Sequence, residues 1–217
     1  MRHYPDSKVE IQGFAARYYD AMLNAATLGG YSVFIKNAIA AIGIQPSDKI
    51  LDLGAGTGRN ALLMNAFLDG GGKIVGMEIS TEMIKRFEEK TKGFNNIEVL
   101  NRRIDEPFDL KEPFDKVFIS FVLHGFPHPV REKVIQNVYN NLKDGGEFII
   151  LDYNEFKIGQ MPLYARIPFT ALECKYAFDF VERDWRKILT GYHFGDFTQK
   201  IFMMNYIRLL RAKKMAV

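Results

Sequence analysis

The stretch ILDLGAGTGRN, residues 50–60, joins a short apolar run to an acid and then to three glycines, Gly54, Gly56 and Gly58. An apolar run that stops at glycines is typical of a buried strand. Glycines permit backbone conformations that other residues avoid, and they let a ligand approach the main chain closely. The stretch therefore predicts a strand followed by a ligand-binding loop.

On both sides of this stretch, segments with apolar residues at helical spacing alternate with short, continuous apolar runs that are typical of buried strands. Strands are predicted at residues 49–53, 73–78, 97–101, 115–123 and 147–153. Helices are predicted at residues 9–24, 31–44, 61–68, 80–90, 129–142 and 184–189, and a strand pair at the end of the chain. Near-continuous apolar strands between helices favour an α/β fold, with a mostly parallel sheet covered on both faces.

Composition narrows the class of protein. The 29 basic and 26 acidic residues leave a net charge of +3, which is too small to indicate nucleic acid by itself. No run approaches the roughly 20 apolar residues of a membrane span, so stable membrane insertion is not expected. The N-terminal residues have no apolar core like that of a secretory signal. The single cysteine, Cys174, excludes an internal disulfide and favours a cytoplasmic location.

Two acids help to choose between ligands for the glycine loop. Dinucleotide-binding loops use G-x-G-x-x-G, whereas Gly54, Gly56 and Gly58 follow G-x-G-x-G. Asp52 precedes the turn, where a carboxylate suits an ammonium or sulfonium group better than a phosphate. Glu78 ends the second strand and can accept bonds from two ribose hydroxyls, which alone does not discriminate between the ligands.

Four segments in order resemble the class I S-adenosylmethionine-dependent methyltransferases: ILDLGAGTG, VGMEIS, KVFISFVLHGF and NNLKDGGEFIILDY. The resemblance covers residues 45–153 and continues weakly to residue 212. SFVLHGFPHP and FAARYYD are similar to the small-molecule branch that includes the ubiquinone/menaquinone-biosynthesis methyltransferases. The resemblance implies a Rossmann-like, doubly wound sheet of seven strands in the order 3-2-1-4-5-7-6, with the last strand antiparallel.

The same resemblance predicts a single methyltransferase domain over residues 1–217. It would comprise an N-terminal helical lid (1–44), a cofactor-binding core (45–153), an aromatic cap inserted after the fifth strand (154–183), and a C-terminal helix and strand pair (184–217). The sequence leaves the oligomeric state open, a homodimer included.

The family pattern also implies the residues that bind S-adenosyl-L-methionine. The glycine loop would lie along the aminocarboxypropyl part, and Glu78 would hold the ribose. Ile79 and Met83 would pack on adenine, Ile104 would offer its backbone to the ring, and Ser120 would end the fourth strand. The expected cofactor-binding residues are Tyr19, Asp52, Gly54, Ala55, Gly56, Glu78, Ile79, Met83, Arg103, Ile104 and Ser120.

Two of these positions carry alternatives. The family usually has an acid that bonds the adenine amino group where this chain has Arg103. Either Asp105 takes that role through a shifted loop, or backbone and stacking hold the adenine, and Arg103 could then stack on the base. Tyr19 either closes over the cofactor as part of a lid or forms the apolar face of its helix.

The resemblance implies an enzyme that transfers a methyl group by in-line displacement. A neutral acceptor also needs a base, and His124 is the first candidate and Asp152 the second. The alternative for His124 is a purely structural histidine, and the alternative for Asp152 is a cap or turn residue. No metal is expected, because the remaining histidines lack the spacing of metal ligands.

The aromatic, methionine-containing cap favours a small apolar or amphipathic acceptor, quinone-like or lipid-like, and nucleic acid is not an expected partner. Two other classes stay open. One is a module that binds S-adenosylmethionine without catalysis. The other is a nicotinamide-dependent oxidoreductase, which the glycine spacing disfavours.

Overall fold

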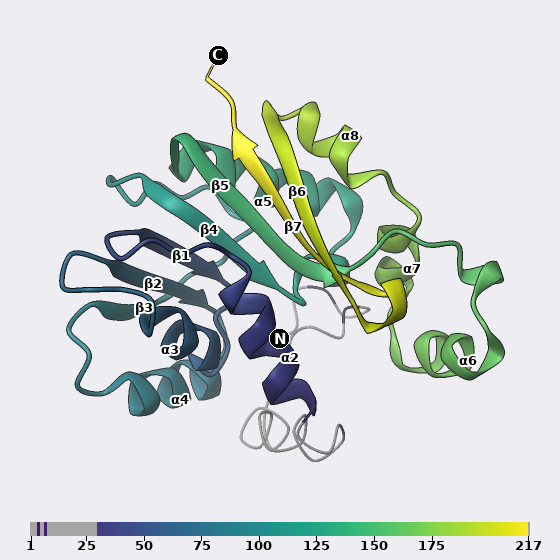
Figure 1. Ribbon diagram of the computed structural model, residues 1–217, viewed down its shortest axis with the longest axis horizontal. Helices are drawn as coiled ribbons and strands as arrows, with labels where there is room; N and C mark the ends of the chain where they lie inside the picture. The colour runs from purple at the N-terminus through teal and green to yellow at the C-terminus, as the bar shows by residue number, and fades with distance from the viewer. Residues whose placement is uncertain (1–3, 5–6, 8–29, 217) are drawn as a thin grey trace.

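The computed structural model describes residues 4, 7 and 30–216, and its centre is a twisted seven-stranded sheet (Figure 1). The strands run in the order β3-β2-β1-β4-β5-β7-β6, and β7 runs antiparallel to the other six strands. This confirms the predicted fold class and strand order. The strands are β1 Lys49–Leu53, β2 Lys73–Glu78, β3 Ile97–Asn101, β4 Phe114–Ser120, β5 Leu142–Tyr153, β6 Phe194–Phe202 and β7 Ile207–Lys214.

Helices cover both faces of the sheet, because successive strand residues point to opposite sides. Ile50 joins a buried apolar cluster with α2, α3 and α4, whereas Leu51 joins a second cluster with α5, α7 and α8. The helices are α2 Gly30–Ala40, α3 Arg59–Asn65, α4 Thr81–Thr91, α5 His128–Asn141, α6 Leu163–Leu172, α7 Lys175–Val181 and α8 Trp185–Thr190. Short 3-10 turns are η1 Leu123–Gly125, η2 Ile158–Gln160 and η3 Met203–Asn205.

Several element ends differ from the sequence-based prediction. The strand expected to reach residue 123 ends at Ser120, because Phe121 has a left-handed φ of 53° and turns the chain into η1. The strand expected from residue 147 begins at Leu142, before an irregularity in its pairing with β4. The helix expected over 31–44 ends at Ala40. The helix expected over 9–24 lies outside the described residues.

The carboxyl ends of β1, β2, β4 and β5 meet at one edge of the sheet, where open α/β folds bind their ligands. The helix after β2 begins with a capped turn, since the Ser80 hydroxyl accepts a hydrogen bond from the Met83 N–H. This cap fixes the direction in which α4 leaves the ligand-binding edge. Glu78 and Met83 consequently face the same space from either end of the turn.

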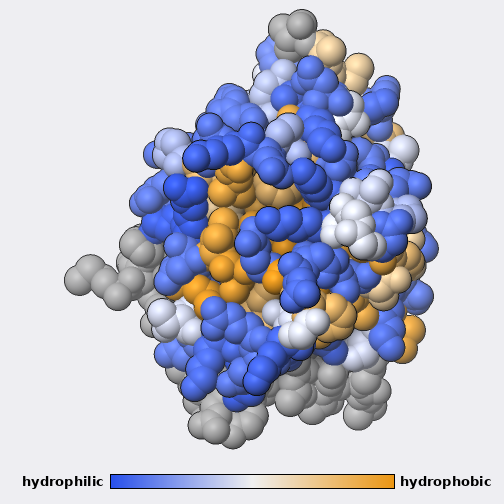
Figure 2. All heavy atoms as spheres, turned by 90° about the vertical axis from the view of Figure 1, so that its left-hand side faces the viewer, coloured by the Kyte–Doolittle hydropathy of each residue, from blue (hydrophilic) through white to orange (hydrophobic). Residues whose placement is uncertain are grey.

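The surface on the β3 side is mostly hydrophilic, with apolar side chains gathered near its centre (Figure 2). β3 is the outer parallel strand, and Val99 and Leu100 on it are only half-buried. No helix in the described part of the chain is long and apolar enough to cross a lipid bilayer.

Gly76, in the middle of β2, lets the glycine loop pack directly on the sheet. A Cβ atom at this position would lie 2.9 Å from both Cβ of Ala55 and Cε2 of Phe87. We therefore expect Gly76→Ala to lower the free energy of unfolding by about 1–3 kcal/mol, measured by urea denaturation. Gly70→Ala is the matched control, because its Cβ would meet no atom within 4 Å in the described part of the chain apart from its chain neighbours. Equal stability of the two variants would contradict this packing.

Candidate active site

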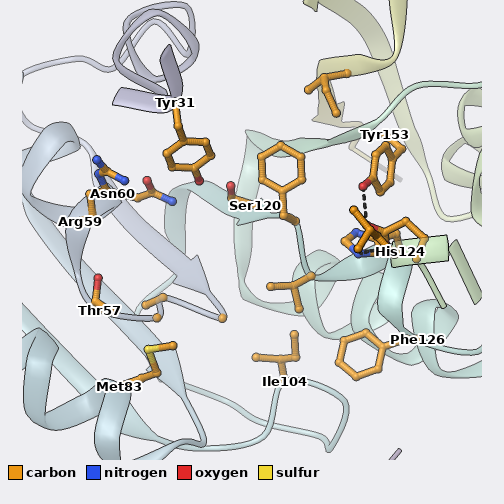
Figure 3. Close-up of a pocket in the computed structure, with 18 of the residues that line it drawn as sticks. Tyr31, Thr57, Arg59, Asn60, Met83, Ile104, Ser120, His124, Phe126 and Tyr153 are labelled. Carbon is orange, nitrogen blue, oxygen red and sulfur yellow. Dashed lines mark hydrogen bonds and ion pairs between the residues drawn. The ribbon is translucent and has the colours of Figure 1, made fainter. Parts of the chain in front are cut away.

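A cavity of about 1010 Å³ opens at the ligand-binding edge of the sheet. It runs from the glycine loop after β1, past the ends of β2 and β4, to the cap helix α6. Figure 3 shows Tyr31, Arg59 and Thr57 near one end and His124, Tyr153 and Phe126 near the other. Single-ligand pockets are typically about 300–1,000 Å³. The cavity therefore has room for a cofactor and a second small molecule together.

The glycine loop forms part of the cavity wall with its own backbone. Gly54 and Gly56 have φ values of 72° and 55°, a region that favours glycine. A Cβ at Gly54 would lie 2.7 Å from Cγ2 of Val122, whereas a Cβ at Gly56 would have no atom of the described residues within 4 Å apart from its chain neighbours. The first glycine is therefore needed for packing, and the second leaves open space in front of the main chain. This cradle fits the close approach of the expected cofactor.

Glu78 holds the glycine loop and the start of the next turn in place. Its Oε2 accepts a hydrogen bond from the Gly56 N–H at 3.0 Å. Its Oε1 accepts from the N–H groups of Ile79 and Ser80 at 2.8 and 2.9 Å. The carboxylate also lines the cavity, where a ribose would find an acceptor with remaining capacity.

Asp52 lies behind the loop rather than in the cavity wall. The residue is 1% exposed, and its strand neighbours in register are Gly76 and Phe118. Burial, and then the charge of Glu78, raise the pKa of the Asp52 carboxyl to about 7. Among the described residues, its Oδ2 has no hydrogen-bond partner. Any influence of Asp52 on a cationic ligand would therefore act through its charge rather than through contact.

The other residues expected beside the cofactor converge on the same wall. Cavity-lining positions include Ile79, Met83, Arg103, Ile104 and Ser120. The loop that carries Ile104 is fixed from α5, because the Asn137 amide donates to the carbonyls of Ile104 and Glu106 at 2.9 and 2.8 Å. Tyr19 lies outside the described residues.

Arg103, at the position where the family usually has an acid, forms ion pairs with the two acids that follow it in the chain. Its guanidinium pairs with the carboxylates of Asp105 and Glu106 and lies 5.9 Å from the centre of the Tyr4 ring. The Tyr4 hydroxyl also donates to Asp105, and burial followed by this contact raises the pKa of Tyr4 to about 12. Asp105 lines the cavity and accepts this hydrogen bond from Tyr4. Both roles considered for Asp105 and Arg103 remain predictions.

His124 and Asp152 form a buried pair at the other end of the cavity. Nδ1 of His124 lies 2.7 Å from Oδ1 of Asp152, and the His124 backbone N–H donates to Oδ2 at 3.2 Å. Arg131 holds the η1 turn by donating to the carbonyls of Leu123 and His124 at 3.1 and 3.0 Å. Because the carboxylate takes Nδ1–H, the Nε2 atom of the neutral ring is left as an acceptor. Asp152 itself lies behind the histidine.

A second carboxylate, Glu173 from the α6–α7 junction, completes this cluster. Its Oε2 lies 3.6 Å from Nε2 of His124, and its Oε1 accepts from the Tyr153 hydroxyl at 2.7 Å (Figure 3). Burial, and then Glu173, raise the pKa of the Tyr153 hydroxyl. Glu173 was not among the predicted site residues. One signal could have found it, since Glu173 is the single acid within the aromatic segment 156–178.

Burial lowers the pKa of His124, but the charge of Asp152, its hydrogen bond and the charge of Glu173 together raise it above 6.5. A histidine that is buried, oriented by one carboxylate and beside another is an arrangement suited to moving a proton. The rest of this end of the cavity is apolar. Its lining includes Phe121, Val122, Phe126, Phe156, Met161 and Phe169.

The chain is similar in sequence to a known family of domains and to curated proteins. A family model described as "Methyltransferase domain" matches residues 44–189, more than half of the chain. A demethylmenaquinone methyltransferase of Staphylococcus carnosus is 28% identical over 190 residues, covering 79% of this chain and 77% of that protein. The ubiquinone/menaquinone biosynthesis C-methyltransferase UbiE of Francisella philomiragia is 31% identical over 144 residues, covering 64% of this chain and 56% of that protein.

Solved structures share the fold at lower identity. Human N-acetylserotonin methyltransferase in complex with SAM superposes with a TM-score of 0.67 at 18% identity, covering 94% of this chain and 59% of that chain. The S-adenosylmethionine-dependent methyltransferase SibL in its apo form gives a TM-score of 0.70 at 14% identity, covering 95% of this chain and 60% of that chain. The chain therefore belongs to the methyltransferase-domain family, which confirms the predicted class I S-adenosyl-L-methionine-dependent methyltransferase and its cofactor.

Proposed function

We propose that the protein methylates a ring carbon of a small, apolar aromatic compound that carries an ionisable hydroxyl group, as a hydroquinone does. The observation that carries this proposal is the continuity of the cavity. One space of about 1010 Å³ joins the glycine loop to an apolar chamber that ends at His124. The names of the UbiE and demethylmenaquinone relatives support an aromatic acceptor of this kind.

The residues of the chain account for the proton that such an acceptor must lose. When bound, S-adenosyl-L-methionine supplies an electrophilic methyl group on a sulfonium. Nε2 of His124 takes the hydroxyl proton of the acceptor, and Asp152 stabilises the resulting imidazolium through Nδ1–H. The negative charge left on the acceptor oxygen spreads into the ring and makes the neighbouring carbon nucleophilic. After methylation, with S-adenosylhomocysteine as the leaving product, the hydrogen on that carbon leaves as a proton to the Glu173 carboxylate, and His124 returns its proton to the ring oxygen, which restores the aromatic hydroxyl compound.

Glu173 and the apolar lining position the acceptor. Glu173 faces Nε2 of His124 from the cap. A substrate hydroxyl placed between them can donate a hydrogen bond to either group, and its proton can leave toward either. Phe121 and Phe126 line the chamber, exclude water and strengthen the electrostatic interactions inside it. Phe121 keeps its left-handed backbone, a conformation that bulky residues adopt mainly where the surroundings impose it.

The two competing classes predict different ligand responses. A ligand that binds only the native state raises the melting temperature. We expect S-adenosylmethionine and S-adenosylhomocysteine to raise it and NAD to leave it unchanged. A shift with NAD alone would favour the oxidoreductase. A shift with S-adenosylmethionine, without turnover of any demethylated hydroquinone, would favour a binding module. Product mass and NMR then separate methylation of carbon from methylation of oxygen.

The pH dependence follows from the His124–Asp152 pair. The base must be neutral, so kcat/KM should fall as the pH drops through the pKa of His124, which Asp152 and Glu173 hold above 6.5 despite burial. We expect the midpoint of this acid limb above pH 6.5 in the wild type and at lower pH in Asp152→Asn. The dependence of kcat/KM on pH is measured for the methyl acceptor at a saturating cofactor concentration. An unchanged midpoint in Asp152→Asn would show that the acid limb does not arise from the His124–Asp152 pair.

We further propose that the protein acts in the cytoplasm, with a small-molecule acceptor as its partner and no nucleic acid. The division into a lid (1–44), a core (45–153), a cap (154–183) and a C-terminal part (184–217) is likewise proposed. The oligomeric state, a homodimer included, is to be measured by light scattering.

A further inference from the structure

Exposed apolar side chains concentrate on α6 and η3. Leu163, Tyr164 and Ile167 of α6 are 62, 69 and 62% exposed, and Met203 and Met204 of η3 are 48 and 73% exposed. These five belong to a set of eleven large exposed hydrophobic residues in the described part of the chain. A sixth member of the set, Leu172 at the end of α6, is 69% exposed, so these two short elements hold six of the eleven. We call the first five residues, Leu163, Tyr164, Ile167, Met203 and Met204, the α6–η3 surface.

The two parts of this surface lie together at the mouth of the cavity. The Phe156 ring contacts Phe169 of α6 and Tyr206 beside η3, with ring centres 5.5 and 5.1 Å apart. Figure 1 shows the turn between β6 and β7 next to α6. Tyr164 and both methionines also line the cavity. The exposed apolar surface is thus continuous with the acceptor chamber.

The backbone of η3 holds its methionines outward in an unfavourable conformation. Met203, Met204 and Asn205 have φ values of 47°, 51° and 73°. Residues with a Cβ rarely adopt this region, and three in succession are unusual. Such strain tends to persist at functional positions, where the surrounding structure imposes it. Here it presents two flexible, apolar side chains to the outside.

The two segments that carry the α6–η3 surface contain cations and no acids, and acids border them at Glu155, Glu173 and Asp196. Residues 156–172 contain Lys157 and Arg166 and no acid, and residues 197–207 contain Lys200 and no acid. These segments contribute three positive charges. The cations therefore lie in the same short segments of the chain as the exposed apolar residues.

We propose that the α6–η3 surface docks on an anionic lipid bilayer, from which the apolar acceptor enters the cavity. Exposed apolar side chains beside cations suit the boundary between lipid headgroups and acyl chains. A second copy of this chain fits less well, because a two-fold interface would bring the same cations of both copies together. The proposal rests on the proposed function in taking the acceptor to be apolar.

Sedimentation with vesicles tests the docking without any acceptor or cofactor. The full chain should pellet with phosphatidylcholine–phosphatidylglycerol vesicles, less with phosphatidylcholine alone, and less at high salt. We expect Leu163→Ser with Ile167→Ser to weaken binding by at least about tenfold. Arg166→Gln and Lys200→Gln should each weaken it by about fivefold. None of these four residues lines the cavity, so turnover of a water-soluble hydroquinone should not change.

Phe94→Ser is the matched control, because Phe94 is 44% exposed in the loop after α4, away from the surface. It should pellet like the wild type. A wild-type chain that stays in the supernatant, or Phe94→Ser losing binding as strongly as the α6 variant, overturns the docking. The docking is also overturned if the wild type does not bind vesicles and the Leu163→Ser, Ile167→Ser variant changes its oligomeric state. That result would assign the surface to an interface with a second copy of the chain. Docking without hydroquinone turnover would instead overturn the proposed function alone.

Discussion

Replacing His124 by alanine is expected to lower kcat by roughly 10²–10⁴-fold, the usual contribution of a positioned base. Affinity for S-adenosyl-L-methionine should stay within about twofold, a difference of less than about 0.5 kcal/mol, because His124 lies at the acceptor end of the cavity and the glycine loop at the other. Single-turnover kinetics measure the chemical step, and titration calorimetry measures the cofactor affinity.

His128 provides the control for this experiment. It lies four residues along the chain, at the first turn of α5, where its ring faces Trp185 rather than the cavity. His128→Ala should retain wild-type turnover. Turnover that survives unchanged in His124→Ala would show that another group takes the proton, and Glu173, 3.6 Å from Nε2, would be the next residue to replace.

The second large effect is expected at Glu78. Its carboxylate accepts from the N–H groups of Gly56, Ile79 and Ser80, and it is also the group predicted to hold the ribose. Hydrogen bonds to a charged group contribute about 1.5–3 kcal/mol each. Glu78→Ala removes the two hydrogen bonds predicted to the ribose hydroxyls, and this loss should weaken cofactor binding by about 10²–10⁴-fold. Calorimetry with S-adenosylhomocysteine measures this directly.

Stability must be followed in the same variant, because the Glu78 side chain also shapes the loop. We expect the melting temperature without ligand to fall, and the shift produced by S-adenosylhomocysteine to disappear. Glu98→Ala, on the solvent side of β3, is the matched control, because its exposed ion pair with Lys73 contributes little. Normal cofactor affinity in Glu78→Ala would remove Glu78 from the cofactor site.

Most of the architecture could be predicted because it depends on local pattern. The apolar runs at 49–53 and 73–78 became β1 and β2 with the predicted bounds. The end of β4 was wrong by three residues, because Phe121 takes a left-handed conformation that its apolar sequence gives no reason to expect. The start of β5 was also wrong, since its pairing with β4 begins before an irregularity.

The acid–base cluster was only partly predictable. His124 and Asp152 each stood out at the end of an apolar strand, but their pairing joins residues 28 positions apart. Glu173 belongs to the cap and meets His124 only because α6 folds back over the cavity. Similarly, the hydrogen bond from Tyr4 to Asp105 joins residues 101 positions apart.

The sequence by itself determined the class of fold, the strand order through its family resemblance, and the cofactor. The fold class follows from the apolar periods of local segments, whereas the strand order and the cofactor follow from the resemblance that the glycine loop, Asp52, Glu78 and the later motifs carry. Only the tertiary structure decided which carboxylates face His124, that Asp52 lies behind the loop, and that α6 and η3 share one exposed apolar surface. Distances between side chains on separate elements depend on how those elements pack, and residue types along the chain do not specify them.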